Sequence, residues 1–474
     1  MAKKKTGLKT KVKKGFVKVE GAGLVGPDGL PIRLRGTCLG GWLNSENFIN
    51  GYPGTDHRWR AVMAETLGAT RARFFFDRML DYFVEEEDIS FIASMGLNFV
   101  RVPFNYRHLE DDAKPFEYRE EGFARLDRVI GWCAKHGVLV ALDLHAAPGW
   151  QNPDWHSDNA GPEALLWKHP HFQERAVALW QEIARRYSDE PTVACYDLLN
   201  EPTQVTVSEL NAFHRAAAKA VRKVDRNHAL FLEGSLYSTS FEGFDEPFDR
   251  NLGYHTHYYA PPGFTNGPYP DAEWDAARIE REFAPRCAFA MEHERPLWVG
   301  EFGAVYWRSD HDSARVRAVD DQIAMFERMG HHWTIWTYKD VGVMGTAYLP
   351  EDSPYMELTR PVQQAKWKLA ADTWGPSGSI IGPETKALEA RILEGMGAAA
   401  PPSGALGGGV GRGVTAAIAE ELLRAYARCF DKLSEKEVDE ALQSFRLANC
   451  AIRTELRDVL ARHAAPRGAA GPAS

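Results

Sequence analysis

Short apolar runs alternate with helix-length segments between residues 31 and 340, and this alternation limits the possible folds more than any other feature of the chain. Strands that alternate with helices form parallel sheets, and strands buried on both faces are almost continuously apolar. Eight such units fit a closed (β/α)8 TIM barrel, an α/β fold, better than an open sheet. The runs predict strands at 32–34, 99–104, 138–144, 194–199, 229–232, 251–259, 297–302 and 333–338.

Composition divides the rest of the chain. Residues 1–30 are basic and lead into the barrel, which we expect over 31–395. Gly, Ala and Pro dominate 396–412, which predicts a linker, and the pattern at 413–463 predicts a helical extension. We expect 464–474 to be disordered. The extension could pack on the barrel or mediate self-association, or it could be a loosely attached appendage.

The charge balance argues against several classes of partner. A net charge of −9, from 56 basic and 65 acidic residues, is unlike the basic footprint of a nucleic-acid binder. We interpret the one basic run as a solvated N-terminus; it comprises Lys3, Lys4, Lys5, Lys9, Lys11, Lys13 and Lys14. No stretch approaches 18 apolar residues, so we expect no membrane-spanning helix.

The cysteines and the N-terminal pattern indicate the compartment. The six cysteines form no C-x-x-C pair and no cluster with histidine, so we expect reduced thiols and no zinc site. No apolar segment follows the lysines, which favours a cytoplasmic protein without a secretory signal. A leader removed from the chain would instead make the protein secreted.

Polar residues follow the predicted strands, at the barrel face where the carboxyl ends of the strands meet and where chemistry takes place. Two long connections, 42–90 and 146–170, lie on the same face and are expected to shape a pocket. The strand-end residues are Arg101, Asn105, His145, Asn200, Glu201, His257, Tyr259, Glu301, Trp336 and Lys339.

Two of these residues carry the chemistry of a glycosidase. Glu201, in Leu-Leu-Asn-Glu-Pro, and Glu301, in Trp-Val-Gly-Glu-Phe-Gly, each follow an apolar strand. Cleavage of an acetal needs one proton donor and one group that captures the oxocarbenium-like centre. Two carboxylates can divide these roles because burial raises one pKa while cationic neighbours lower the other. A salt bridge to a barrel arginine would explain either glutamate alone, but explains the pair poorly.

These motifs resemble glycoside hydrolase family 5. Asn200-Glu201-Pro202 matches the family's acid/base motif, and Glu301 matches its nucleophile on strand seven. Arg101 matches the strand-two arginine that pairs with the nucleophile. Supporting positions also match, namely His145 on strand three, His257 and Tyr259 in the strand-six element, and Trp336, which floors the sugar site on strand eight.

The resemblance implies a role for each supporting residue. Arg101 would keep Glu301 ionised, and Tyr259 would orient it. Asn200 would donate to the sugar 2-hydroxyl. His145 and His257 would orient carboxylates and ring hydroxyls. Because these histidines lie on separate strands with no matching acidic cluster, we expect no metal and no cofactor.

A narrower similarity joins the chain to the exo-β-1,3-glucanases of this family. It rests on residues 40–46, 96–103, 145–152 and 157–161. The resemblance implies that Glu46 binds hydroxyls of the terminal sugar and that Trp155 clamps the next sugar. The loop at 150–157 is longer than this group leads us to expect, and the segment 340–360 differs.

The sequence therefore predicts a retaining hydrolase that cleaves β-glucosidic bonds, of the exo-β-1,3-glucanase or β-glucosidase type. Its partner would be a β-linked oligosaccharide or glycoside, with no nucleic acid and no membrane, and with possible self-association through the C-terminal helices. An endo-β-1,4-glucanase or β-mannanase is the alternative. A barrel that binds carbohydrate without cleaving it is a more distant one.

Overall fold

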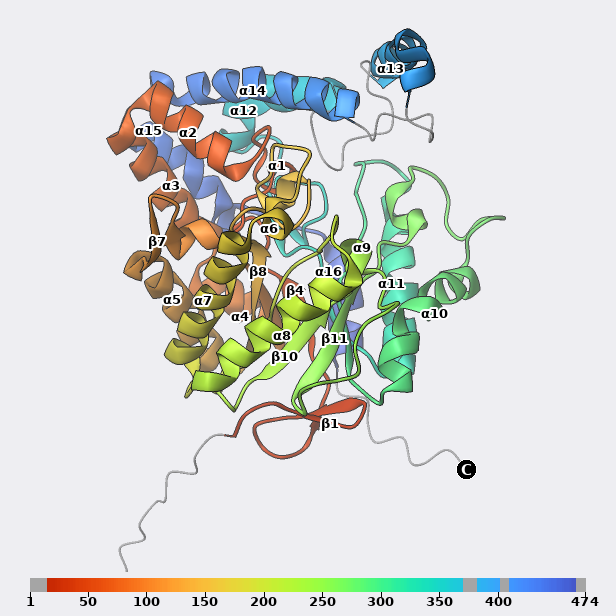
Figure 1. Cartoon of the computed structure of the whole chain (residues 1–474). Coiled ribbons are helices and arrows are strands. Elements are labelled where there is room, and N and C mark those ends of the chain that lie inside the picture. Colours follow the sequence, from red (N-terminus) through yellow and green to blue (C-terminus); the bar gives the residue numbers. More distant parts are fainter. Residues whose placement is uncertain (1–14, 370–381, 401–408, 466–474) are drawn as a thin grey trace, which may run out of the picture.

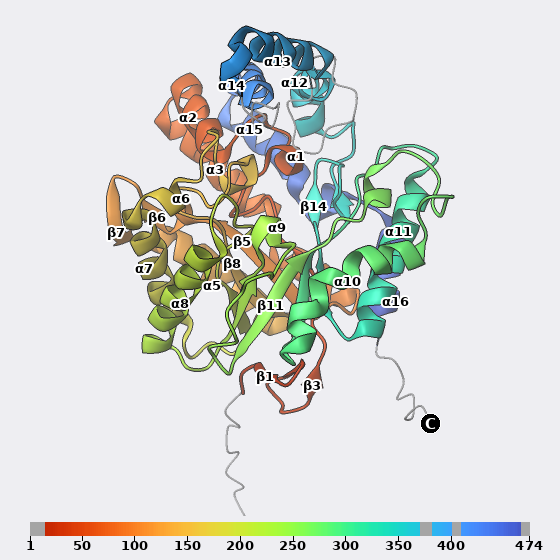
Figure 2. The same ribbon diagram turned by 45° about the vertical axis from the view of Figure 1, so that its right-hand side comes forward.

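The computed structural model describes residues 15–369, 382–400 and 409–465. Within these ranges, parallel strands close into one barrel in the order β10-β11-β12-β13-β4-β5-β8-β9 (Figures 1 and 2). The barrel strands are β4 (Arg35–Cys38), β5 (Phe99–Asn105), β8 (Leu139–Ala146), β9 (Val193–Asp197), β10 (Ala229–Glu233), β11 (Leu252–His257), β12 (Leu297–Glu301) and β13 (His332–Ile335). The predicted (β/α)8 fold is confirmed.

The first predicted strand is wrong. The barrel begins with β4, while Pro31–Ile32 forms β3 of a three-stranded antiparallel sheet with β1 (Lys18–Glu20) and β2 (Gly23–Val25). This sheet lies at the bottom of Figure 1, and Leu24 and Leu34 pack there against Phe99 and Trp298. Leu34 is buried because it covers the amino-terminal end of the barrel, and Ile32 packs partly buried in the same cluster.

Amphipathic helices form the outer ring of the barrel. Each buries one apolar face, as α5 does with Phe123, Leu126 and Val129. The ring comprises α4 (Glu86–Ser94), α5 (Glu120–His136), α7 (Pro170–Tyr187), α8 (Val207–Val224), α10 (Ala276–Glu292) and α11 (Asp312–Met329). A capping box of Thr206 and Glu209 starts α8, because each side chain accepts a backbone N–H that the helix leaves unpaired.

The connections on the carboxyl face hold shorter elements. Between β4 and β5 lie α1 (Asn47–Asn50), α2 (Asp56–Leu67) and α3 (Ala69–Phe83). A hairpin of β6 (Glu110–Asp111) and β7 (Lys114–Tyr118) follows β5, α6 (Leu165–Lys168) precedes α7, and α9 (Ser235–Ser238) follows β10. None of the described helices is both long and apolar enough to cross a membrane.

The C-terminal extension packs on the barrel. Figures 1 and 2 show α14 (Gly409–Asp431) lying beside α2 and α12 (Pro354–Leu369), with α13 (Gly382–Met396) further out. Helix α15 (Glu435–Leu442) contacts α3, and α16 (Thr454–Ala464) contacts α11. Strand β16 (Ala451–Ile452) completes a small sheet with β14 (Lys339–Asp340) and β15 (Ala347–Tyr348).

The extension and the barrel share one hydrophobic core. Tyr426, Phe430 and Phe445 are buried in the same cluster as Trp59 and Tyr355. Helix α14 begins at Gly409, inside the predicted linker. The lysine run at residues 3–14, the linker residues 401–408 and the tail 466–474 lie outside the described residues, so the predicted domain boundaries stay predictions.

Candidate active site

A cavity of about 320 Å³ opens at the carboxyl ends of the barrel strands. Seven of its lining residues were predicted to be site residues: Glu46, His145, Glu201, His257, Tyr259, Glu301 and Trp336. Asp154, His156, Tyr237, Thr239 and Arg286 complete the wall. The folded chain thus brings together residues that are up to 290 positions apart (336 − 46).

Glu301 ends β12 and is held by two donors. The Arg101 guanidinium forms an ion pair with Glu301 Oε1, and the Tyr259 hydroxyl donates to Oε2 at 2.7 Å. Burial raises the pKa of Glu301, but His257 and Arg101 outweigh burial, so the pKa lies below its ordinary value. The carboxylate is therefore ionised, as a nucleophile must be.

Glu201 lies four residues beyond β9 in a left-handed backbone conformation, with φ of 47°. Its N–H donates to Glu233 Oε2 at 2.8 Å, and its carbonyl accepts from Asn152 Nδ2 at 3.0 Å. A non-glycine residue is uncommon in this region, and such strain concentrates where surrounding contacts fix a functional side chain. These two bonds hold the strained peptide in place.

Two imidazoles flank the carboxyl group of Glu201. His257 Nδ1 lies 2.6 Å from Oε1, and His156 Nε2 lies 3.0 Å from Oε2. Burial raises the pKa of Glu201, but the two histidines outweigh burial and lower the pKa well below its ordinary value. Without substrate, the charge of this carboxyl group is thus linked to the protonation of its neighbours.

The two carboxylates face each other across the cavity. One oxygen of Glu201, one of Glu301 and a nitrogen of His257 all lie within 4.8 Å of one another. Retaining glycosidases hold their two carboxyl groups about 5–5.5 Å apart, whereas inverting enzymes leave about 6.5–9.5 Å for a water molecule. The observed spacing of the carboxylate oxygens is closer to the shorter separation of retaining enzymes than to that of inverting ones.

His145, Glu46 and Trp336 form another wall of the cavity. His145 Nε2 lies 3.5 Å from Glu46 Oε1, and the His145 ring stacks on Trp336 with 5.3 Å between centroids and 6° between planes. Asn200 Oδ1 accepts from Arg101 at 2.7 Å. Trp155 is half-buried and does not line the cavity among the described residues, so its predicted contact with a second sugar stays a prediction.

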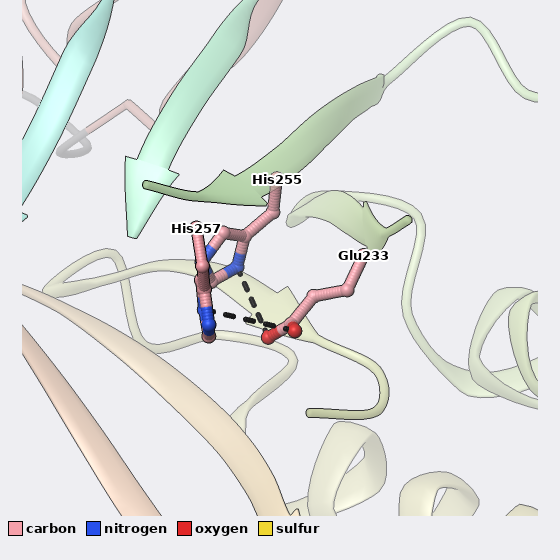
Figure 3. A group of neighbouring side chains, drawn as sticks. All are labelled: Glu233, His255 and His257. Atoms are coloured by element: carbon pink, nitrogen blue, oxygen red, sulfur yellow. Dashed lines mark hydrogen bonds and ion pairs between the residues drawn. The ribbon is translucent and has the colours of Figure 1, made fainter. Parts of the chain in front are cut away.

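Beneath the cavity lies a fully buried layer of three carboxyl groups and one histidine, none of which was predicted to be a site residue. Arg101 forms ion pairs with Asp143 at 3.0 Å, Asp197 at 3.1 Å and Glu233 at 2.9 Å. Figure 3 shows Glu233 pointing from the end of β10 toward His255 and His257 on β11. The sequence did hold a signal for this layer, because Asp143 and Asp197 are acidic residues inside apolar strands.

One guanidinium cannot neutralise all of these carboxylates. Burial and the charge of Asp197 raise the pKa of Glu233 well above its ordinary value. Asp197, with His255 Nδ1 at 2.8 Å, has its pKa lowered to about 2, because His255 and Arg101 overcome burial. Burial therefore favours the protonated form of Glu233, whereas Asp197 stays ionised beside it.

The same residues could be considered as metal ligands. Donor atoms of Glu233, His255 and His257 lie within 4.8 Å of one another, and so do those of Asp143, Asp197 and Glu233. Arg101 already pairs with every carboxylate of the second group and with Glu233 of the first. A cation here would lie against a resident positive charge, so the residues fit a hydrogen-bonded support better than a metal centre.

Two of the strand-end polar residues serve the fold rather than the cavity. Lys339 is buried, pairs with Asp88 at 2.6 Å and donates to the Phe445 carbonyl at 2.7 Å. Asn105 Nδ2 donates to Asp158 at 3.0 Å. Their position after a strand was correct, but their side chains tie the barrel to the extension and to a neighbouring loop.

A closed (β/α)8 barrel with two facing carboxylates at its carboxyl end is the architecture of a glycoside hydrolase. Residues 69–342 match the model of the cellulase family, glycosyl hydrolase family 5. The chain belongs to this family, and its substrate is a carbohydrate.

Three named proteins resemble the chain to different extents. A β-xylosidase of Phanerodontia chrysosporium is 38% identical over 95% of this chain and 98% of its own length. A probable glucan 1,3-β-glucosidase A of Emericella nidulans is 29% identical over 57% of this chain and 67% of its own. The solved endoglucanase of Thermotoga maritima has 24% identity and a TM-score of 0.48, over 56% of this chain and 84% of its own.

Proposed function

We propose that this family 5 enzyme is a retaining hydrolase that removes terminal sugars from β-glucosides, including β-1,3-linked ones, with Glu301 as nucleophile and Glu201 as acid/base. The observation that carries the proposal is the pair of carboxylates within 4.8 Å of each other in one small cavity. Each carboxylate also has the donors its role needs: Arg101 and Tyr259 for the nucleophile, and two imidazoles for the acid/base.

In the first step, Glu301 Oε2 or Oε1 attacks the anomeric carbon while Glu201 gives its proton to the departing glycosidic oxygen. The carbon–oxygen bond to the leaving group breaks as the glycosyl–Glu301 ester forms. In the second step, Glu201 takes a proton from water, whose oxygen attacks the same carbon and releases Glu301. We expect the Asn200 amide, whose Oδ1 accepts from Arg101, to donate through Nδ2 to the sugar 2-hydroxyl.

The size of the cavity supports exo rather than endo action. A volume of about 320 Å³ is at the lower end of the range of about 300–1,000 Å³ typical of ligand sites. Glu46, His145 and Trp336 line one side of it, which suits a terminal sugar whose hydroxyls are all bonded. An endo-β-1,4-glucanase or a β-mannanase would need a groove that continues past these residues.

A β-xylosidase is the second candidate, because the relative that carries this name is 38% identical over 95% of the chain. Xylosides lack the hydroxymethyl group that glucosides carry at C5. We therefore expect the ratio of the two activities to depend on how closely the cavity walls pack around that hydroxymethyl group. Comparing kcat/KM for aryl β-glucoside and aryl β-xyloside decides between them.

The deciding experiment is a product-resolved screen of laminari-, cello-, manno- and xylo-oligosaccharides. Release of single sugars from one end, with retained anomeric configuration by NMR, would support the proposal. Internal cleavage to mixed oligosaccharides would replace it with the endo-acting alternative, and an inverted first product would remove Glu301 from the nucleophilic role.

Replacing Glu301 by Ala should abolish turnover of aryl β-glycosides, with kcat lower by about 10⁴-fold or more, because no covalent intermediate can form. The measurement is release of the aryl alcohol. Ligand protection against heat should persist, because Glu46, His145 and Trp336 are intact. Substantial remaining turnover would contradict the assignment.

Replacing Glu201 by Ala should separate substrates by leaving group. For a poorly activated alcohol, kcat/KM should fall by about 10²–10⁴-fold, because protonation of the leaving oxygen is lost. A dinitrophenyl glycoside needs no proton and should lose far less. Equal losses on both substrates would remove Glu201 from the acid role.

We also propose a cytoplasmic location, which the free state of all six cysteines supports. Self-association through the C-terminal helices is a further proposal. The packing of α14, α15 and α16 on the barrel leaves only their outer faces for a second copy.

A further inference from the structure

Glu201 has a second imidazole beside it that none of the sequence motifs assigned. His156 lies on a short 3₁₀ turn, Trp155–Ser157, in the long loop after β8. Its Nε2 lies 3.0 Å from Glu201 Oε2, and the two side chains are each only 13% exposed. Since His257 Nδ1 lies 2.6 Å from Oε1, each oxygen of the acid/base carboxyl faces its own imidazole nitrogen.

Neighbouring amides fix the position of the His156 ring. Asn44 Nδ2 donates to the His156 carbonyl at 3.1 Å, and Asn152 Nδ2 lies 2.8 Å from His156 Nε2. The Asn152 amide is oriented by two other bonds, because its Oδ1 accepts from the Asp154 N–H at 3.0 Å and its Nδ2 donates to the Glu201 carbonyl at 3.0 Å.

This arrangement allows a proton between His156 and Glu201 to occupy either side. When the proton is on Glu201, Oε2–H donates to the lone pair of Nε2. When the proton is on the imidazole, Nε2–H donates to the carboxylate. Both states keep one hydrogen bond between Oε2 and Nε2, and in each state the Asn152 amide keeps its bond to the Glu201 carbonyl.

We propose that His156 is a positioning residue that shares one proton with Glu201 and thereby keeps the acid loaded for protonation of the leaving group. The inference rests on the proposed function of Glu201. In this transfer Nε2–H gives its proton to Oε2. The imidazolium becomes a neutral imidazole, and the carboxylate becomes a carboxylic acid. No electrons move and no other reactant takes part.

Other charged or titratable groups face this pair from the surrounding elements. They are Glu46 after β4, His145 on β8, Asp154 on the same loop, Glu233 on β10, His257 on β11 and Glu301 on β12. Burial lowers the pKa of His156, but Glu201 and the other carboxylates outweigh it and raise the pKa to about 9. The pair therefore holds its proton to a higher pH than a lone carboxyl group would.

The variant His156→Gln tests the proposal, with His171→Gln on the exposed start of α7 as the matched control. The measurement is kcat/KM against pH for one poorly and one highly activated aryl β-glycoside. With the poor leaving group, the alkaline limb should move to lower pH, so that activity near pH 8 falls about tenfold or more while activity near pH 5 stays within about threefold of wild type.

The activated substrate should stay within about threefold of wild type across the whole pH range, because it needs no proton. The control variant should match wild type with both substrates. An unmoved alkaline limb would overturn the inference. So would a loss equal for both substrates at every pH, because that is the result of a loop that is merely disordered.

A second measurement needs no variant and therefore does not depend on how the variant folds. Nitrogen NMR of the labelled wild-type histidines should show His156 titrating together with the Glu201 carboxyl carbon. Independent titration of the two groups would overturn proton sharing. If wild type cleaves no aryl β-glycoside, the proposed function fails instead, and the NMR result still decides whether the proton is shared.

Discussion

Each active-site carboxylate owes its ionisation to the donors around it, because burial alone would protonate both. The pKa of Glu301 is lowered by His257 and Arg101 and that of Glu201 by His156 and His257. The supports differ in kind. Arg101 is a permanent cation, whereas an imidazole can give up its proton near neutral pH. A fixed charge suits a nucleophile, and a titratable neighbour suits a group that must gain and lose a proton.

Replacing Tyr259 by Phe removes the hydroxyl that donates to Glu301 Oε2 at 2.7 Å. A hydrogen bond to a charged group stabilises it by about 1.5–3 kcal/mol, so the pKa of Glu301 should rise by about one unit or more. The acidic limb of kcat/KM should therefore move to higher pH, because Glu301 must be ionised to attack.

The matched control for this variant is Tyr258→Phe, whose hydroxyl donates to the Ile279 carbonyl at 2.8 Å. Its acidic limb should coincide with that of wild type. If Tyr259→Phe also leaves the limb in place, the hydroxyl does not tune Glu301.

Neighbouring strands support the site because they approach each other closely. Gly300, on β12 directly before Glu301, lies against the His255 ring on β11, where a Cβ atom would overlap the imidazole. His255 in turn stacks on Trp298, with 4.2 Å between centroids, and its Nε2 lies 3.1 Å from His257 Nε2. Any side chain at position 300 would thus disturb His255, which in turn supports His257, the histidine beside Glu201.

Replacing Gly300 by Ala should destabilise the barrel by about 1–3 kcal/mol, because the buried ring has no free space into which to move. We also expect lower kcat, since His257 would shift away from Glu201. Thermal unfolding and kcat on one aryl glycoside measure the two effects. Gly395→Ala is the control, because no atom lies within 4 Å of a Cβ there, and equal behaviour of the two variants would refute the steric argument.

The C-terminal extension is part of the enzyme rather than an appendage. Phe430 is fully buried, with ring centroids of Phe75 at 4.9 Å and Tyr426 at 5.2 Å. Tyr426 shares a hydrogen bond of 2.6 Å with Tyr355, whose hydroxyl also donates to the Asn50 carbonyl at 2.6 Å. These contacts link α14 to the loop that carries Glu46.

Replacing Phe430 by Ala should cost about 3–5 kcal/mol of stability, because a large aromatic side chain leaves a cavity in a shared core. Heat inactivation of glycosidase activity should occur at a lower temperature, together with unfolding of the barrel. Leu388→Ala, on exposed α13, should change neither. If activity survives heating as in wild type, the extension and the barrel unfold independently.

The sequence predicted the barrel because a strand buried on both faces must be apolar over its whole length. The alternation of strands and helices can therefore be read from local patterns, without knowledge of which residues are in contact. That logic misplaced the first strand, because Leu34 is buried against the amino-terminal end of the barrel and Ile32 belongs to the small sheet there. It also overlooked α3, whose apolar face contacts α15 from the far end of the chain.

By itself, the sequence determined the order of strands and helices, the place of Glu201 and Glu301 at strand ends, and the arginine, tyrosine and tryptophan beside them. These follow from local patterns and motifs. Only the tertiary structure brought His156 to Glu201 and stacked Asp143, Asp197 and Glu233 around Arg101. The reason is physical: pKa values and hydrogen-bond partners depend on distances of a few ångströms between strands, and loop conformation, not residue order, sets those distances.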